Sequence, residues 1–371
     1  MKKSFLLLIF NILLIVIFLA AAPYPSIAIA NDDINKNKSS DKIAKNNTPF
    51  HKQFRGIVFA PQGIKNADDF VINFKKLVEH ALVPLGINAI IFDMHWNNYN
   101  FTSTKELKNL SRKENLDFSK KHAAKLSKIC KENNLDVIVG MNVLTHQNYG
   151  QFLKAFPNLK WPGLDNLWDP LDPMVNKIAF KMIDELINSF SPKAFHIGMD
   201  EGYDFNALTL PSNRDKRFSN SQLFAKVVND FHEHIVGSHG LEIMMWSDML
   251  ENRHGIVDLE NALNLINKEV IMVSWNYADR PEYPWPGKLM DKGFRVIVAP
   301  HKDLAAAKKF LNTAIRENNS KLIGILYTTW SSKVATDLRY ALTKKADHTK
   351  NLDENMLGVA ETIKGTIGLF Q

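Results

Sequence analysis

The chain has 371 residues, of which 45% are hydrophobic and 23% are charged, enough for one large domain or two small ones. The formal net charge is +7, but the basic residues outside the N-terminal region are scattered among acidic ones, so nucleic acid is not an expected partner. A single cysteine, Cys130, excludes an intramolecular disulfide.

The first 30 residues have the pattern of a signal peptide. Lys2 and Lys3 precede an almost wholly apolar run at 5–22, and Ala-Ile-Ala at 28–30 is a small-x-small cleavage site. The run is also nearly long enough to span a bilayer, so an uncleaved membrane anchor is the alternative. In either case we expect the protein to be exported, to the periplasm or the outside of the cell. In the second case this segment would attach it to the membrane.

Residues 31–50 are rich in Asn, Lys, Asp and Ser and have no apolar period, so they are predicted to form a flexible linker. Beyond them, β-type apolar runs alternate with amphipathic helical stretches. The runs are 56–60, 88–93, 136–142, 194–199, 242–246, 270–275, 295–299 and 323–328. The helical stretches include 68–82, 119–132, 175–189, 221–236, 304–317 and 353–364.

This alternation predicts an α/β fold with a buried parallel sheet. Eight strand–helix units favour a (β/α)8 TIM barrel, which makes 51–371 a single catalytic domain. A doubly wound open sheet is the alternative. The last helical stretch would pack against the barrel or against a partner.

Polar and aromatic residues gather where six of the predicted strands end. The ends read Asp93-Met94-His95-Trp96, Asn142 through Gln147, His196 through Glu201, Trp246-Ser247-Asp248, Trp275-Asn276-Tyr277 and Thr328-Thr329-Trp330. In a barrel the C-terminal strand ends converge on the face that carries the active site. A tryptophan after a strand is usually a packing residue, but the repetition at most strand ends predicts a functional site.

Two adjacent carboxylates, Asp200 and Glu201, end the fourth predicted strand. Neighbours in an extended chain point to opposite sides, so we expect different roles for them rather than a shared proton. Tryptophans also lie at strand ends, and sugar rings have apolar faces on which aromatic side chains pack. Carboxylates among tryptophans therefore predict a carbohydrate pocket.

Metal and cofactor chemistry is not expected. Three histidines, His95, His146 and His196, would converge with Asp93 and Asp200 at the barrel mouth. However, these histidines form no His-x-His or His-x-x-x-His pair. The chain also has no glycine-rich phosphate loop and no Gly-x-Ser-x-Gly elbow. We therefore predict no metal and no cofactor.

The run His196-Ile197-Gly198-Met199-Asp200-Glu201 resembles the His-x-Gly-Gly-Asp-Glu signature of family 20 glycoside hydrolases, the β-N-acetylhexosaminidases. Other segments look like pieces of that family in the same order: Phe54-Arg55-Gly56, Gly86 through Ile91, Asn142 through Gln147 with Phe156-Pro157, Met245 through Met249, and Val273 through Tyr277. The resemblance covers roughly residues 54–345. Met199 departs from the second glycine. No small α/β domain precedes the barrel, as in the shorter, barrel-only bacterial-type branch.

The resemblance implies a retaining exo-β-N-acetylhexosaminidase that removes terminal β-linked GlcNAc or GalNAc from N-acetylhexosamine-containing glycans. Its mechanism would be substrate-assisted, with the substrate's own acetamido oxygen as nucleophile. Glu201 would be the general acid and later the general base. Asp200 would orient the acetamido N–H.

The resemblance also implies a set of substrate-binding residues. Tyr277 would hydrogen-bond the acetamido oxygen, the tryptophans would wall the sugar, and Arg55 and Asp248 would bind ring hydroxyls. For His196 a buried structural role stays open beside substrate contact. The full set is Arg55, His146, His196, Trp246, Asp248, Trp275, Tyr277 and Trp330. The alternative functions are a non-catalytic barrel that binds amino-sugar glycans and a barrel hydrolase of another glycosidic bond.

Overall fold

The computed structural model describes residues 50, 53–60, 66–95, 99–205, 218–331, 333–343 and 351–370. The chain divides into two units, Met1–Lys45 and Asn46–Gln371, and every described residue belongs to the second unit. The predicted signal peptide lies outside the described residues, as does the predicted linker except for Phe50. Among the described helices, none combines the length and the apolar character that crossing a bilayer requires.

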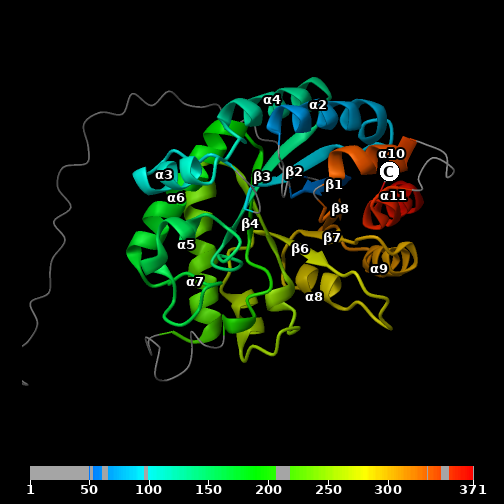
Figure 1. Ribbon diagram of the computed structural model, residues 1–371. Coiled ribbons are helices and arrows are strands. Elements are labelled where there is room, and N and C mark those ends of the chain that lie inside the picture. Colours follow the sequence, from blue (N-terminus) through cyan, green and yellow to red (C-terminus); the bar gives the residue numbers. More distant parts are fainter. Residues whose placement is uncertain are drawn as a thin grey trace, which may run out of the picture. The chain divides into compact units, whose positions relative to one another are not determined.

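Eight parallel strands close into a barrel in sequence order (Figure 1). They are β1 (Phe54–Phe59), β2 (Ala89–Asp93), β3 (Asp136–Val143), β4 (Ala194–Gly198), β5 (Glu242–Trp246), β6 (Ile271–Trp275), β7 (Val296–Ala299) and β8 (Leu322–Tyr327). The barrel closes where β1 pairs with β8, with Phe54 opposite Gly324. The predicted (β/α)8 barrel is thereby confirmed, and the open-sheet alternative is wrong.

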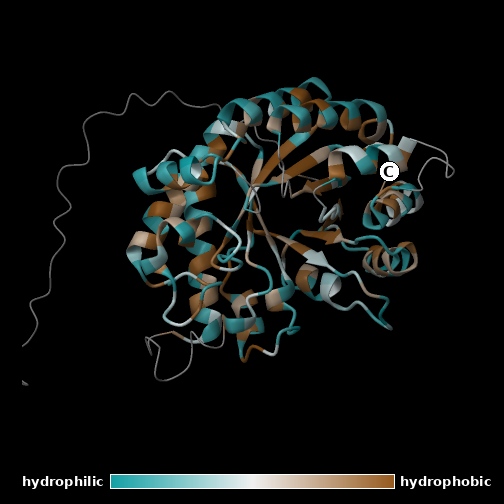
Figure 2. Cartoon of the chain, in the orientation of Figure 1, coloured by the Kyte–Doolittle hydropathy of each residue, from teal (hydrophilic) through white to brown (hydrophobic). Residues whose placement is uncertain are grey.

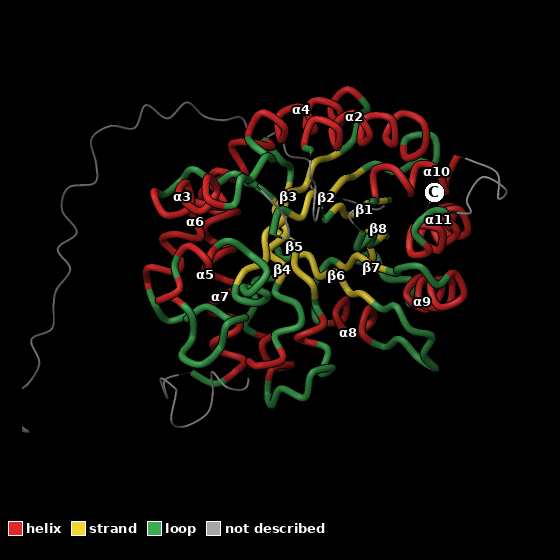
Figure 3. Tube along the Cα trace, viewed as in Figure 1, coloured by secondary structure: helices red, strands yellow, loops and turns green. Residues whose placement is uncertain are grey.

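Helices surround the strands, as Figures 1 and 3 show. The α-helices are α2 (Ala67–Leu77), α3 (Lys105–Lys113), α4 (Lys120–Glu132), α5 (Phe152–Ala155), α6 (Pro173–Phe190), α7 (Asn220–His232), α8 (Trp285–Asp291), α9 (Leu304–Arg316), α10 (Arg339–Thr343) and α11 (Glu354–Thr366). The π-helices are η1 (Val78–Leu82), η4 (Glu233–Ser238) and η7 (Val334–Leu338). The 3₁₀ turns are η2 (Pro157–Leu159), η5 (Asp248–Leu250), η6 (Leu259–Asn264) and η9 (Ile367–Phe370). The tail helix α11 packs against α9, so it belongs to the barrel.

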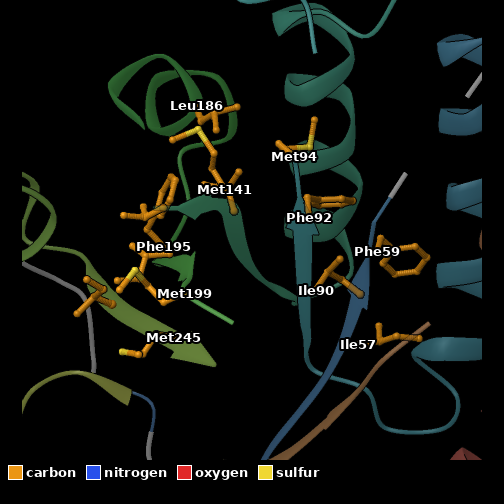
Figure 4. Close-up of a cluster of buried hydrophobic side chains, with 14 of the residues drawn as sticks. Ile57, Phe59, Ile90, Phe92, Met94, Met141, Leu186, Phe195, Met199 and Met245 are labelled. Atoms are coloured by element: carbon orange, nitrogen blue, oxygen red, sulfur yellow. The ribbon is translucent and has the colours of Figure 1, made fainter. Parts of the chain in front are cut away.

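Alternate residues of each strand face two separate cores. In β2, Ala89 and Ile91 point into the barrel, whereas Ile90 and Phe92 point outward toward the helices. Figure 4 shows part of the outer core, in which Phe59 and Phe92 lie beside each other. Burial on both faces explains why the strands read as continuous apolar runs, which are brown in Figure 2.

Candidate active site

A cavity of about 290 Å³ opens where the strands end, and seven of the ten predicted site residues line it. They come from the C-terminal ends of β5 and β6 and from the segments that follow β3, β4, β6 and β8. The lining residues are His146, Asp200, Glu201, Trp246, Trp275, Tyr277 and Trp330. The structure therefore brings together most of the residues that the strand-end pattern singled out. Trp96, at the end of the second predicted strand, lies outside the described residues.

A left-handed backbone turns both carboxylates toward the cavity. Gly198 and Met199 have φ angles of 68° and 73°, and Glu201 has a φ of 50°. A Cβ atom on Gly198 would lie 1.5 Å from Asn142 Oδ1, so only glycine fits against β3 here. Met199, which stands where the family signature has glycine, adopts the glycine-like conformation and buries its side chain in the outer core. The departure therefore leaves the turn intact.

His146 faces both carboxylates. Its Nε2 lies 3.3 Å from Asp200 Oδ2 and 3.7 Å from Glu201 Oε2. Burial raises the pKa of Asp200, and the contact with His146 opposes that shift without reversing it. Burial also pulls the pKa of His146 down, but the neighbouring carboxylates outweigh it, and the pKa of His146 is raised. The contact with Asp200 thus favours the protonated form of His146, which would balance negative charge on that carboxylate.

Asp248 anchors the backbone of Glu201 by a hydrogen bond. Its Oδ2 accepts a hydrogen bond from the Glu201 backbone N–H at 3.0 Å and another from His254 Nε2 at 2.7 Å. The Asp248 side chain is fully buried and does not line the cavity. The predicted contact with sugar hydroxyls is thus corrected, because the chain turns into the 3₁₀ helix η5 at Asp248 and carries the carboxylate inward.

Four aromatic side chains, those of Trp246, Trp275, Tyr277 and Trp330, form much of the cavity wall. Trp330 Nε1 donates a hydrogen bond to the Tyr277 hydroxyl at 2.9 Å, which links the β6 and β8 ends. The ring of Trp246 lies 6.1 Å from that of Trp330, and Trp275 lies 4.9 Å from Tyr277, between ring centres. Burial raises the pKa of Tyr277, so this residue remains a neutral phenol and a hydrogen-bond donor.

Arg55 is not part of this site. It is the second residue of β1 and therefore lies near the N-terminal end of the barrel, away from the mouth. Its Nε donates to the Gly86 carbonyl at 2.6 Å, and its NH1 donates to the Phe370 carbonyl at 3.0 Å. The predicted substrate contact of Arg55 is wrong, and the residue instead ties β1 to the chain end.

His196 lies in the barrel interior rather than on the cavity wall. Its ring is 4.6 Å from the Trp246 ring, and its Nδ1 accepts a hydrogen bond from the Gly198 N–H at 3.1 Å. Burial lowers the pKa of His196 to about 3, so the imidazole is neutral. Of the two roles left open by the sequence, the geometry favours the buried structural one.

Several supporting residues were not assigned from the sequence. His95 donates from Nε2 to the His146 carbonyl at 2.8 Å, and burial lowers the pKa of His95 to about 4. Its place in the Asp93–Trp96 strand end was the available signal. His254, the partner of Asp248, lies in a loop whose sequence has no recognisable pattern.

A buried carboxylate, Glu251, supports the part of the cavity wall that Trp275 forms. It accepts hydrogen bonds from Ser247 at 2.6 Å and Ser274 at 2.8 Å, and it pairs with Arg253. Arg253 in turn lies over the Trp275 ring, 4.9 Å from its centre. This chain of contacts fixes the orientation of Trp275.

One ligand atom from each of His146, Asp200 and Glu201 lies within 4.8 Å of the other two, which is close enough to hold a metal ion. The arrangement can equally serve acid–base chemistry without a metal. The expectation of a metal-free site therefore stays a prediction.

Residues 103–363 match the family model described as glycosyl hydrolase family 20, catalytic domain, which is more than half of the chain. Solved structures of low identity share the fold. A chitobiase from Flavobacterium johnsoniae aligns with a TM-score of 0.61 and 17% identity, over 86% of this chain and 52% of that one. An exo-β-N-acetylglucosaminidase from Vibrio harveyi aligns with a TM-score of 0.56 and 14% identity, over 86% and 57%.

Dispersin B is similar over nearly its whole length, with a TM-score of 0.54, 15% identity, and coverage of 85% of this chain and 98% of that one. The chain thus spans little more than half of the chitobiase and of the Vibrio enzyme, but nearly the whole of dispersin B. No curated protein gives a significant match. The family model, the closed barrel and the Asp200–Glu201 turn together show that the chain belongs to glycosyl hydrolase family 20.

Proposed function

We propose that the protein is a retaining β-N-acetylhexosaminidase that removes terminal β-linked N-acetylhexosamine from glycans. The observation that carries this proposal is the left-handed turn that directs Asp200 and Glu201 into one cavity walled by Trp246, Trp275 and Trp330. Membership of family 20 supports the same activity.

The size of the cavity supports attack on a chain end. At about 290 Å³ it lies at the lower limit of small-molecule pockets, which run from about 300 to 1,000 Å³. A single sugar residue matches such a volume better than a stretch of polysaccharide does. We therefore favour exo action.

Glu201 is the proposed general acid. It transfers its proton to the glycosidic oxygen while the acetamido oxygen of the substrate attacks the anomeric carbon, so the aglycone leaves as an alcohol and a cyclic oxazolinium ion remains. Water then attacks the anomeric carbon from the side that the aglycone left, and the bond between that carbon and the acetamido oxygen breaks, which restores the neutral acetamido group. Glu201 takes a proton from that water, which regenerates the acid and retains the configuration.

Asp200 and Tyr277 are proposed to hold the acetamido group. Asp200 accepts the N–H hydrogen bond and stabilises the positive charge that develops on the ring, while His146 keeps the carboxylate in place at 3.3 Å. The Tyr277 phenol donates to the acetamido oxygen. The indole rings exclude water and pack on the apolar face of the sugar.

The test of the acid uses aryl β-N-acetylglucosaminide and aryl β-N-acetylgalactosaminide substrates. Glu201→Gln removes the proton and should lower kcat by about 10²–10⁴ for a poor leaving group. The loss should shrink with dinitrophenol, which leaves without protonation. Asp204→Asn, an equal change in charge on an exposed residue nearby, is the matched control. Unchanged turnover of the poor leaving group by Glu201→Gln would contradict the assignment.

Substrate assistance is tested separately with a thiazoline that mimics the oxazolinium ion. It should inhibit the native enzyme, and Asp200→Asn should weaken both inhibition and kcat. An active enzyme that the thiazoline does not inhibit would argue for a hydrolase of another glycosidic bond. Tight glycan binding without turnover of either substrate would identify a non-catalytic binding barrel.

We also propose export, based on the charged, apolar and small-x-small pattern of residues 1–30. Fractionation of the producing cell and N-terminal sequencing of the mature protein test this proposal. A soluble product that begins after residue 30 supports a cleaved signal. A full-length product in the membrane fraction supports the anchor, and a full-length product in the cytoplasm contradicts export.

A further inference from the structure

Three potential metal ligands meet on the outer surface of the barrel. Asp184 lies on α6, His234 lies on the π-helix η4, which continues α7, and His239 is the residue that caps the end of η4. Asp184 Oδ1 is 2.7 Å from His234 Nε2 and 2.8 Å from His239 Nε2. Within the part of the chain that the structure describes, only this group and the active-site group place three such ligand atoms within 4.8 Å of one another.

The π-helix brings the two histidines together. An α-helix has 3.6 residues per turn, so residues five apart point in different directions. The wider π turn, with its i→i+5 hydrogen bonds, brings such residues onto one face, and π segments are rare and frequent at functional sites. The ring of His234 also stacks on Phe180, with 4.0 Å between centres and 4° between planes, which fixes its orientation.

We propose that Asp184, His234 and His239 form a Zn²⁺ site that ties the end of α7 to α6. Two imidazole nitrogens and a carboxylate oxygen are ligands that suit zinc, whereas Mg²⁺ and Ca²⁺ prefer oxygen ligands. The side chains of Asp184, His234 and His239 are 38%, 16% and 25% exposed, so solvent reaches the site and water can complete the coordination.

In the structure the distances between Asp184 Oδ1 and the two histidine nitrogens are those of hydrogen bonds, in which protons occupy the position that zinc would take. Zinc bonds of about 2.0–2.2 Å in a tetrahedral arrangement separate the ligand atoms by about 3.4 Å. His234 and His239 therefore need to withdraw from the carboxylate by only about 0.6–0.7 Å, and zinc takes the place of the bridging protons. Binding should consequently release protons and weaken as pH falls.

The site is remote from catalysis. Helices of a (β/α)8 barrel run opposite to its strands, so the end of α7 lies toward the N-terminal ends of the strands, while the active site lies at their C-terminal ends. Zinc here would act on stability rather than on the reaction. The proposal therefore stands or fails independently of the hexosaminidase activity.

The test titrates the untagged, metal-free protein with ZnCl₂ by calorimetry and counts bound metal after dialysis. We expect one ion at this site and, at metal concentrations about 100 times Kd, a rise in Tm of about 4 °C. CoCl₂ should produce a visible d–d absorption band, and MgCl₂ should not bind there. His239→Gln and Asp184→Asn should each weaken binding at least tenfold and remove the cobalt band.

His232→Gln is the matched control, because His232 lies on α7 and pairs with a single carboxylate, Glu269, at 2.9 Å. It should leave zinc affinity unchanged. A second variant, His146→Asn, separates this site from the active-site group. The proposal is overturned if zinc and cobalt do not bind. It is also overturned if binding survives both Asp184→Asn and His239→Gln, or if it is lost in His146→Asn instead.

Discussion

Gly198→Ala should damage both stability and turnover. The new Cβ would lie 1.5 Å from Asn142 Oδ1 and 2.8 Å from Asn142 Cα. The amide can rotate away, but the Cα cannot, so β3 and β4 would have to separate where Val143 pairs with Gly198. The left-handed φ of 68° costs about 1–2 kcal/mol for alanine, and overpacking adds about 1–3 kcal/mol. We expect a loss of about 2–5 kcal/mol in the free energy of unfolding, measured by urea denaturation.

Gly163→Ala isolates the contribution of the backbone. Gly163 has a φ of 83°, but a Cβ there would meet nothing within 4 Å, so only the left-handed cost of about 1–2 kcal/mol applies. Its kcat on an aryl β-N-acetylglucosaminide should equal that of the native protein. Gly198→Ala should lower kcat at least tenfold, because Asp200 moves with the turn. Equal stability losses and equal kcat in the two variants would refute the argument from close approach.

Substitutions at three further residues test the surroundings of the site. Both Met199→Ala and Met199→Gly lose a buried side chain, but glycine relieves the left-handed strain, so in urea unfolding the glycine variant should be the more stable by about 1 kcal/mol; the opposite order would contradict this backbone assignment. Arg253→Met leaves the buried Glu251 carboxylate unpaired and should cost about 3–5 kcal/mol at pH 8. The cost should be smaller at pH 5, because burial raises the pKa of Glu251 and eases its protonation; a loss that does not depend on pH would count against that role. The pKa of His95 falls from 6.5 to about 4 on folding, so its contribution to stability is present above pH 6.5 and is lost as pH falls toward 4. His95→Gln should reduce that acid-induced loss by about 3 kcal/mol, and an unchanged pH profile of unfolding would show that His95 is not the responsible group.

The strands were predictable because burial on both faces makes each strand a continuous run of apolar residues in the sequence. The fifth strand, Glu242–Trp246, matches its predicted bounds to the residue, and the other strands differ by at most two residues at either end. Helix α3 was not predicted, because most of Lys105–Lys113 is polar and it buries only Leu107 and Ser111. The π-helical end of α7 was predicted as ordinary helix, since apolar spacing does not distinguish the two.

Site residues could be predicted from the sequence where the direction of a strand alone determines whether a residue reaches the cavity. Residues at the end of a strand or shortly after it, such as Trp246 and Tyr277, reach the cavity. Arg55 was misplaced because its position near the start of β1 puts it at the wrong end of the barrel. Asp248 was misplaced because a short 3₁₀ turn reverses its direction. Its contact with Glu201 spans 47 residues of sequence, and no local pattern encodes such a contact.

The anchoring of Glu201 limits how the catalytic run can be transplanted. The backbone of the run rests on Asp248 in the following βα unit, and its Gly198 fits against Asn142 in the preceding one. Grafting His196 through Glu201 alone onto another barrel would transfer the sequence of the run without the two neighbouring contacts that shape its backbone. The smallest portable module is therefore three consecutive βα units, from β3 through the loop after β5.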